Sequence, residues 1–104
     1  GFWYVAGGAR FMEAGDSRYN DLGMQVSENA GVGWSEAAIS TSGITQSEGG
    51  ETLCAVFLSK IMDVTNTTNI LVRFFTLVSN DATSTLASTA ANELYFTFTR
   101  LGDT

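Results

Sequence analysis

Apolar and polar residues alternate along much of the chain, and this period of two is typical of β-strands with one buried face. The alternation predicts strands over residues 2–12, 21–27, 34–39, 52–62, 70–78 and 93–101. The segments between them are rich in Gly, Asn, Asp, Ser and Thr, which turns and loops prefer. Short strands separated by turns predict an all-β fold, an antiparallel β-sandwich of the jelly-roll kind, in one domain over residues 1–104.

One segment between the strands fits two structures. In Ser84–Leu94, the spacing of Leu86, Ala90 and Leu94 at every fourth residue is that of one face of a short helix. The same segment contains several Ser, Thr and Asn residues, which are poor in the interior of a helix. A loop is therefore the favoured prediction for this segment, with a short helix as the alternative.

The alternation divides each strand into two faces. Leu53, Ala55, Phe57 and Ile61 share one face of the strand over 52–62, opposite Cys54, Val56, Leu58, Lys60 and Met62. Leu94, Phe96 and Phe98 share one face of the last strand, opposite Tyr95, Thr97 and Thr99. The large apolar side chains predict a core that includes Val5, Phe57, Val72, Phe74, Phe96 and Phe98.

The strand over 70–78 is apolar on both faces, which a strand with one wet face should not be. Ile70, Val72, Phe74, Thr76 and Val78 form the uncharged set, and we expect them to fill the sandwich. Leu71, Arg73, Phe75 and Leu77 then lie outside, where an apolar row indicates an interaction surface. We expect this row to be the interface of a homotrimer. Tyr95 joins it if the last strand lies in the same sheet.

Arg73 is the one charge in this row, and two placements are open. At an interface its guanidinium needs a carboxylate, for which Glu93 of a neighbouring copy is a candidate. At a strand edge its head group would instead extend into water.

Composition removes several kinds of chemistry. The chain has 104 residues, no histidine and a single cysteine, which excludes a His-based catalytic triad and an internal disulfide. Its formal charge of -6, with 5 basic against 11 acidic residues, argues against binding to nucleic acid. No apolar run approaches the roughly 20 residues of a membrane-spanning helix. We expect no cofactor, no membrane insertion and no enzymatic activity.

A few residues could still carry chemistry, each with a plainer alternative. The acid pairs Glu48/Glu51 and Asp16/Asp21 are candidates for a glycosidase, but solvated turn carboxylates are the favoured interpretation. The oxygen-rich run Asp16–Asp21 suggests a calcium ion or an Asx-type turn, without the glycine and distant glutamate of an EF-hand. Cys54, with no activating histidine, is predicted to be a small buried residue.

Aromatic residues offer one further kind of site. Trp3, Tyr4 and Trp34 are candidates for a platform on which sugar rings stack, but packing in a core or interface is the favoured interpretation. Such a platform would suit a carbohydrate-binding module.

The two ends of the chain carry the motifs of a resemblance to a known family. Asp63–Asn69 followed by Val72–Phe74 resembles a DVT-(N/D)-T…VRF segment, and Tyr95–Asp103 resembles a TFxRLGD carboxy terminus. Gly1–Val5 and the turn Asp16–Asp21 fit the same pattern. Together they resemble the C-terminal domain of virion structural or tail-fibre proteins of tailed bacteriophages. Thr99 departs from this pattern, which has a larger residue there.

The resemblance implies a jelly-roll domain like those of the complement and tumour-necrosis-factor trimers, located in the virion. It implies a non-enzymatic adhesive role, with a host-surface glycan or protein bound through the loops and other virion proteins as partners. It also implies that the chain is the C-terminal part of a longer protein. The alternative hypothesis is a monomeric carbohydrate-binding module of a secreted enzyme.

Overall fold

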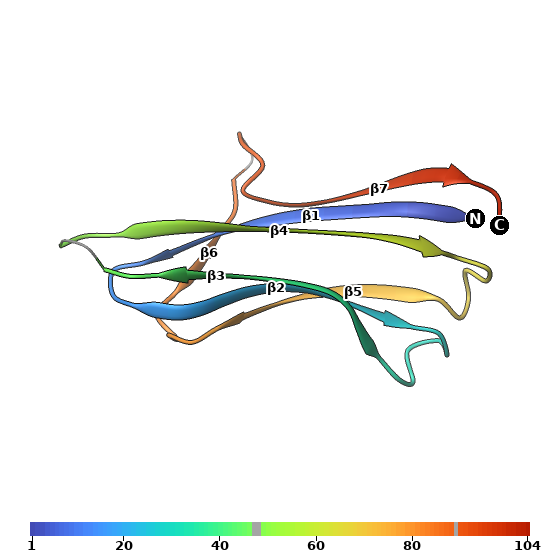
Figure 1. Cartoon of the computed structure of the whole chain (residues 1–104), viewed down its shortest axis with the longest axis horizontal. Coiled ribbons are helices and arrows are strands. Elements are labelled where there is room, and N and C mark those ends of the chain that lie inside the picture. The colour runs from blue at the N-terminus through green and yellow to red at the C-terminus, as the bar shows by residue number, and fades with distance from the viewer. Residues whose placement is uncertain (47–48, 89) are drawn as a thin grey trace.

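Two antiparallel β-sheets pack face to face in the computed structural model, which describes residues 1–46, 49–88 and 90–104 (Figure 1). In chain order the strands are β1 (Phe2–Glu13), β2 (Ser17–Ser27), β3 (Ser35–Ile44), β4 (Thr52–Asp63), β5 (Leu71–Val78), β6 (Ser84–Leu86) and β7 (Leu94–Gly102). The first sheet has the order β4-β1-β7, with β6 beside the far end of β1, and the second has the order β3-β2-β5. The predicted all-β sandwich is confirmed.

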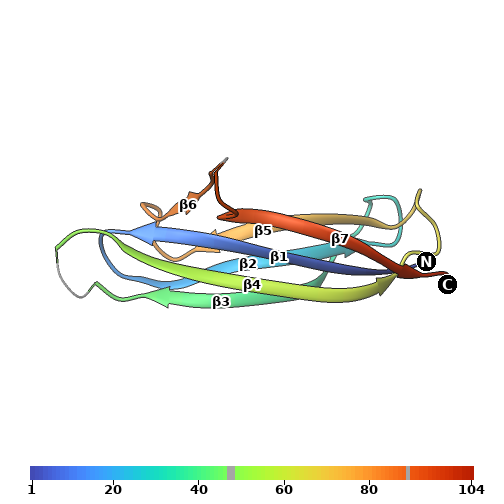
Figure 2. The same cartoon turned by 90° about the horizontal axis from the view of Figure 1, so that it is seen from above.

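The two sides of the sandwich differ. Figure 2 shows β3 and β4 along one side and β5 and β7 along the other. β3 and β4 contact each other, which closes the first side. On the second side the rings of Phe74 and Phe96 stack with their centroids 3.7 Å apart, so aromatic side chains bridge the two sheets there.

β2 and β3 extend well beyond their predicted bounds, and in β2 the added residues include buried polar side chains. β2 begins at Ser17, where Ser17 Oγ donates to Asn20 Oδ1 at 2.7 Å. Asn20 is fully buried, and its Nδ2 donates to the Ser42 carbonyl of β3 at 3.1 Å. Because these polar groups satisfy one another, they can be buried without breaking the strand pattern.

The segment between β5 and β7 contains a short strand that the sequence did not predict. Ser84–Leu86 forms β6, in which Leu86 pairs with Arg10 of β1. The helical alternative for Ser84–Leu94 is wrong over the described part of that segment, and Thr89 lies outside the described residues. No helix that could cross a membrane is found in the part of the chain that the structure describes.

The core lies between the sheets and confirms most of the predicted positions. Its fully buried residues come mainly from β1, β2 and β4, and Val5 is among them. Val72, Phe74 and Phe96 are partly buried and pack against this core.

The prediction is wrong for two of the core residues, because the structure leaves them largely exposed. Phe57 is 64% exposed, because β4 turns Val56 and Leu58 inward and Phe57 to the outside. Phe98 is 51% exposed, because it lies on β7, at the edge of its sheet.

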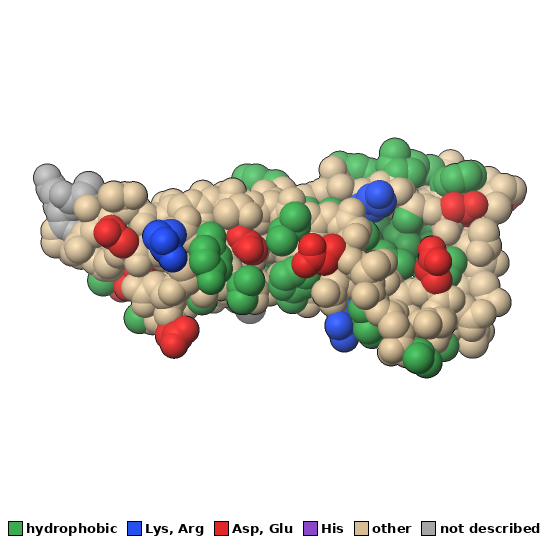
Figure 3. Space-filling view, turned by 60° about the horizontal axis from the view of Figure 1, so that its bottom comes forward, with side chains coloured by type: hydrophobic (Ala, Val, Ile, Leu, Met, Phe, Trp, Pro, Cys, Tyr) green, Lys and Arg blue, Asp and Glu red, His purple; other side chains and the backbone are tan. Residues whose placement is uncertain are grey.

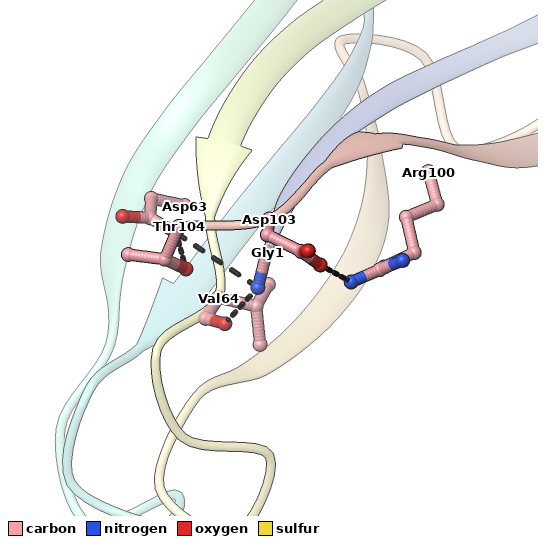
Figure 4. Close-up of polar contacts among 6 residues, drawn as sticks. All are labelled: Gly1, Asp63, Val64, Arg100, Asp103 and Thr104. Carbon is pink, nitrogen blue, oxygen red and sulfur yellow. Dashed lines mark hydrogen bonds and ion pairs between the residues drawn. The ribbon is translucent and has the colours of Figure 1, made fainter.

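The two chain ends lie side by side at the end of β4 (Figure 4). The Gly1 ammonium donates to the Val64 carbonyl at 2.7 Å, and the Val64 N–H donates to the Gly1 carbonyl at 2.8 Å. Thr104 Oγ1 donates to Asp63 Oδ1 at 2.7 Å. These bonds join β1, β4 and the residues after β7 at one end of the first sheet.

Candidate functional site

The outer side of the first sheet carries a row of exposed apolar side chains. Cross-strand register places Tyr4 opposite Ile61, and Gly8 opposite both Phe57 and Tyr95. We call this surface the first-sheet face, and its large apolar members are Phe2, Tyr4, Leu53, Phe57, Ile61 and Tyr95. Phe57 is 64% exposed and Ile61 59%, which are high fractions for side chains of this size.

A glycine positions the aromatic rings of this face. A Cβ atom at Gly8 would lie 2.9 Å from Tyr95 Cε1 and 3.0 Å from Phe57 Cδ1. The two rings therefore reach across the β1 backbone from both neighbouring strands. The centre of the first-sheet face is therefore covered by aromatic rings.

The middle of the first-sheet face is free of charge. Asp63 opposite Phe2 and Arg10 opposite Ala55 are the charged residues at its two ends, and Arg10 Nη1 contacts Glu93 Oε1 at 2.9 Å. Between them β1, β4 and β7 place only Ala, Gly, Ser, Thr, Ile, Phe and Tyr on the outside. A partner surface could therefore cover this region without burying an ionised group.

The outer side of the second sheet carries the predicted interface row, interrupted by charges. Leu71, Arg73, Phe75 and Leu77 all face outward from β5, as the alternation predicts. Asp21 lies opposite Leu77, and Gln25 lies opposite both Arg73 and Glu36. Figure 3 shows this side of the molecule, where acidic and basic side chains separate small hydrophobic groups.

The structure divides the predicted interface set between two surfaces. Tyr95 lies on β7, which belongs to the first sheet, whereas the other members lie on β5 in the second sheet. Tyr95 therefore does not join the row of Leu71 and Leu77. Tyr95 would join that row only if β5 and β7 shared a sheet, and they do not.

Arg73 has partners within its own chain. Its Nε donates to Gln25 Oε1 at 2.7 Å, and its guanidinium carbon lies 4.1 Å from the centre of the Trp34 ring. A guanidinium over an indole face is a cation–π contact. Arg73 consequently needs no carboxylate from a neighbouring copy, and Glu93 is already paired with Arg10.

The predicted aromatic platform is not assembled. Trp3 faces the interior from β1, where it lines a cavity with Phe98 and Val72. Tyr4 faces the opposite way, on the first-sheet face, and Trp34 lies against Arg73 of the second sheet. The three rings thus belong to three different surfaces.

The predicted acidic sites are dispersed. Asp16 Oδ1 accepts from the Gln46 N–H at 2.6 Å, whereas Asp21 lies within β2. Glu51 is exposed just before β4, and Glu48 lies outside the described residues. Within residues 1–46, 49–88 and 90–104, no three acidic or cysteine side chains cluster closely enough to hold a metal ion.

A buried polar cluster surrounds Cys54, which is half-buried and faces the core. Asn20 Nδ2 lies 3.6 Å from Cys54 Sγ, and Ser17 Oγ lies 3.3 Å from Ser79 Oγ. These contacts join β2, β4 and the loop after β5. The cluster is structural, since its polar atoms are used in bonds to one another.

Sequence reasoning missed the first-sheet face as a site. The alternation had grouped Leu53, Phe57 and Ile61 correctly, but the largest ring of that group suggested the core. Gly8 was the available signal, because a glycine opposite an aromatic residue leaves room for a ring to lie across the strand. Scanning family models and searching curated proteins and solved structures found no match to this chain.

Proposed function

We propose that this domain is a structural and adhesive module of a virion fibre that acts as a homotrimer, without enzymatic activity. The observation that carries the self-association is the uncharged first-sheet face with Phe57 and Ile61 exposed at its centre. The virion setting rests on the resemblance of the end motifs to tail-fibre domains. Host attachment would use the loops, with other virion proteins as further partners.

The size of the face supports a role in assembly. Nine residues of β1 paired with two neighbouring strands cover about 30 Å by 14 Å, or about 400 Å² of flat area. The largest apolar patch on a typical monomer covers roughly 300–600 Å² and is often functional. Three copies around a threefold axis would each bury such a patch against the others.

The choice of the first sheet follows from charge. Burying the second sheet's outer side would also bury the exposed carboxylate of Glu36, and removing a carboxylate from water is costly without a partner. Covering the first-sheet face between Arg10 and Asp63 would remove no charged side chain from water. We therefore place the trimer interface on the first sheet, away from Leu71 and Leu77.

Light scattering tests the assembly directly. The chain should have three times the monomer mass of 11.1 kDa. Phe57→Glu should reduce this to the mass of one chain, because it places a carboxylate at the centre of the buried surface. Phe57 is exposed within its own chain, so the variant should remain folded by circular dichroism.

Leu77→Glu is the matched control, since Leu77 is 52% exposed on the outside of the second sheet. This variant should keep the trimer mass. A wild-type monomer at high concentration would refute the proposal. Dissociation by Leu77→Glu but not by Phe57→Glu would move the interface to the second sheet.

A row of exposed aromatics also favours the second candidate, a monomeric carbohydrate-binding module. Phe2, Tyr4 and Phe57 lie exposed on one face, and exposed aromatic rings suit stacking against sugar rings. The mass measurement separates the two candidates, because the module would be monomeric. Retention of wild-type chain, but not of Phe57→Glu, on an insoluble polysaccharide would support the module.

A further inference from the structure

Two adjoining hollows lie beside the β2–β3 loop, and the second of them reaches across to β4 of the first sheet. One, of ≈ 390 Å³, is lined by Val26, Glu28, Asn29, Gly33, Trp34 and Ser35. The next, of ≈ 290 Å³, shares Val26, Glu28 and Ser35 and extends to Glu36 of β3 and to Lys60, Ile61, Met62 and Asp63 of β4. We call the two together the Trp34 groove. Figure 3 shows this part of the molecule hollowed, with hydrophobic side chains in the depression and charged ones around it.

The indole of Trp34 is held in a fixed orientation at one end of the groove. Its Nε1 donates to the Gly31 carbonyl at 3.1 Å, and the guanidinium of Arg73 covers the ring at 4.1 Å. Arg73 is itself held by Gln25. A ring fixed in this way loses little conformational freedom when a ligand packs against it.

The loop around the groove is braced by its own polar groups. Asn29 Oδ1 accepts from the Gly33 N–H at 2.8 Å and from Ser27 Oγ at 2.9 Å. Ala30 N–H donates to the Asn69 carbonyl at 2.9 Å, which ties the loop to the β4–β5 connection. The walls of the groove are therefore formed before any ligand arrives.

The lining matches one class of ligand. An indole and Val26 offer apolar contact, while the Glu28 and Glu36 carboxylates and the Ser35 hydroxyl offer hydrogen-bonding oxygens. A sugar ring has both an apolar C–H side and a rim of hydroxyl donors. The lining has three carboxylates, those of Glu28, Glu36 and Asp63, against the one ammonium of Lys60, so on a chain of formal charge -6 it would repel an anionic sugar.

We propose that the Trp34 groove binds a neutral pyranose unit of a surface glycan. This rests on the adhesive role proposed above and assigns it to a defined place. The combined hollows fall within the roughly 300–1,000 Å³ of small-ligand sites, which suits one or two sugar rings. Because every lining residue belongs to one chain, the groove is complete without a neighbouring copy.

Tryptophan fluorescence tests the proposal with defined sugars. In a Trp3→Phe background only Trp34 reports, and the probes are glucose-, mannose- and galactose-based disaccharides with their uronic-acid counterparts. At least one neutral disaccharide should give a saturable change, and its anionic counterpart should bind about tenfold more weakly. No saturable change with any neutral probe, or stronger binding of the anionic probes, would overturn the assignment.

Calorimetry on variants ties the binding to the groove. Trp34→Ala and Glu28→Ala should each weaken affinity by about tenfold, whereas Glu51→Ala, at the opposite end of β4, should not change it. If Trp34→Ala does not fold, the affinity of Glu28→Ala for the sugar still tests the proposal. Equal affinity for wild type and Glu28→Ala would overturn the proposal.

The same titration separates this inference from the proposed assembly. Phe57→Glu, made monomeric, should still bind the sugar, because Phe57 lies on the first-sheet face. A trimer that binds no sugar would refute the groove alone. A wild-type chain that is monomeric and binds sugar would refute the trimer alone.

Discussion

At the scale of single residues, glycines decide where the aromatic rings lie. Phe96 packs over Gly7 inside the sandwich, Phe57 and Tyr95 lie over Gly8 outside it, and the Phe75 ring lies over Gly23. Each ring covers a strand backbone that a Cβ atom would otherwise occupy. These glycines matter because the absence of a side chain makes room for the rings. The pattern of apolar residues does not reveal this role.

Gly7→Ala should destabilise the domain by about 1–3 kcal/mol, the usual cost of overpacking. The new Cβ would collide with Phe96 Cδ1 and fall 3.1 Å from the Tyr95 carbonyl oxygen, so ring and backbone must both shift. Urea unfolding measures the change. Gly102→Ala, where no atom lies within 4 Å of the new Cβ, should change stability little, and an equal loss in both variants would contradict the argument.

At the scale of elements, β7 is the strand that completes the core from the edge of its sheet. It pairs with β1 on one side only, and Phe96 is its side chain that both stacks on Phe74 and packs against the core. Phe98 makes an edge-on contact with Phe74 at 6.1 Å and stays half-exposed. The two phenylalanines therefore share a face but contribute unequally.

Phe96→Ala should lower the free energy of unfolding by about 2–3 kcal/mol, somewhat less than the 3–5 of a fully buried phenylalanine. Phe98→Ala should cost about half as much, since half its surface is already in water. Thermal or urea unfolding of both variants decides the order. A larger loss of unfolding free energy for Phe98→Ala than for Phe96→Ala would show that Phe98 contributes more to packing than Phe96.

At the scale of the whole molecule, charge and assembly oppose each other. The chain carries a formal charge of -6, so its copies repel one another at low ionic strength. In the proposed trimer the uncharged first-sheet face would supply an attraction that salt does not screen. Their balance gives the proposed trimer a dependence on salt that an interface built on ion pairs would not have.

Raising the salt concentration from about 0.02 M to about 0.5 M should strengthen the trimer, because the Debye length falls well below the molecular size. Sedimentation velocity across a dilution series measures the shift. The Phe57→Glu variant should stay monomeric at both concentrations. Weaker assembly at high salt would point instead to an interface held by ion pairs, such as the charged outer side of the second sheet.

The sequence by itself determined the strands and their two faces. Alternation correctly separated Leu71 and Leu77 from Val72 and Phe74, because side-chain direction along a strand depends only on the local backbone. The β-sandwich class followed from the same local signal. Strand ends were harder, since the burial of Ser17 and Asn20 depends on partners far along the chain.

Only the tertiary structure decided which face turns inward and which strands share a sheet. Phe57 and Val56 are both apolar, and the register with Gly8 and Ala9 placed one outside and one in the core. Tyr95 was separated from Leu77 because β7 pairs with β1 rather than with β5. Pairing joins residues that are distant in sequence, so its free energy depends on the whole set of contacts, which local periodicity does not contain.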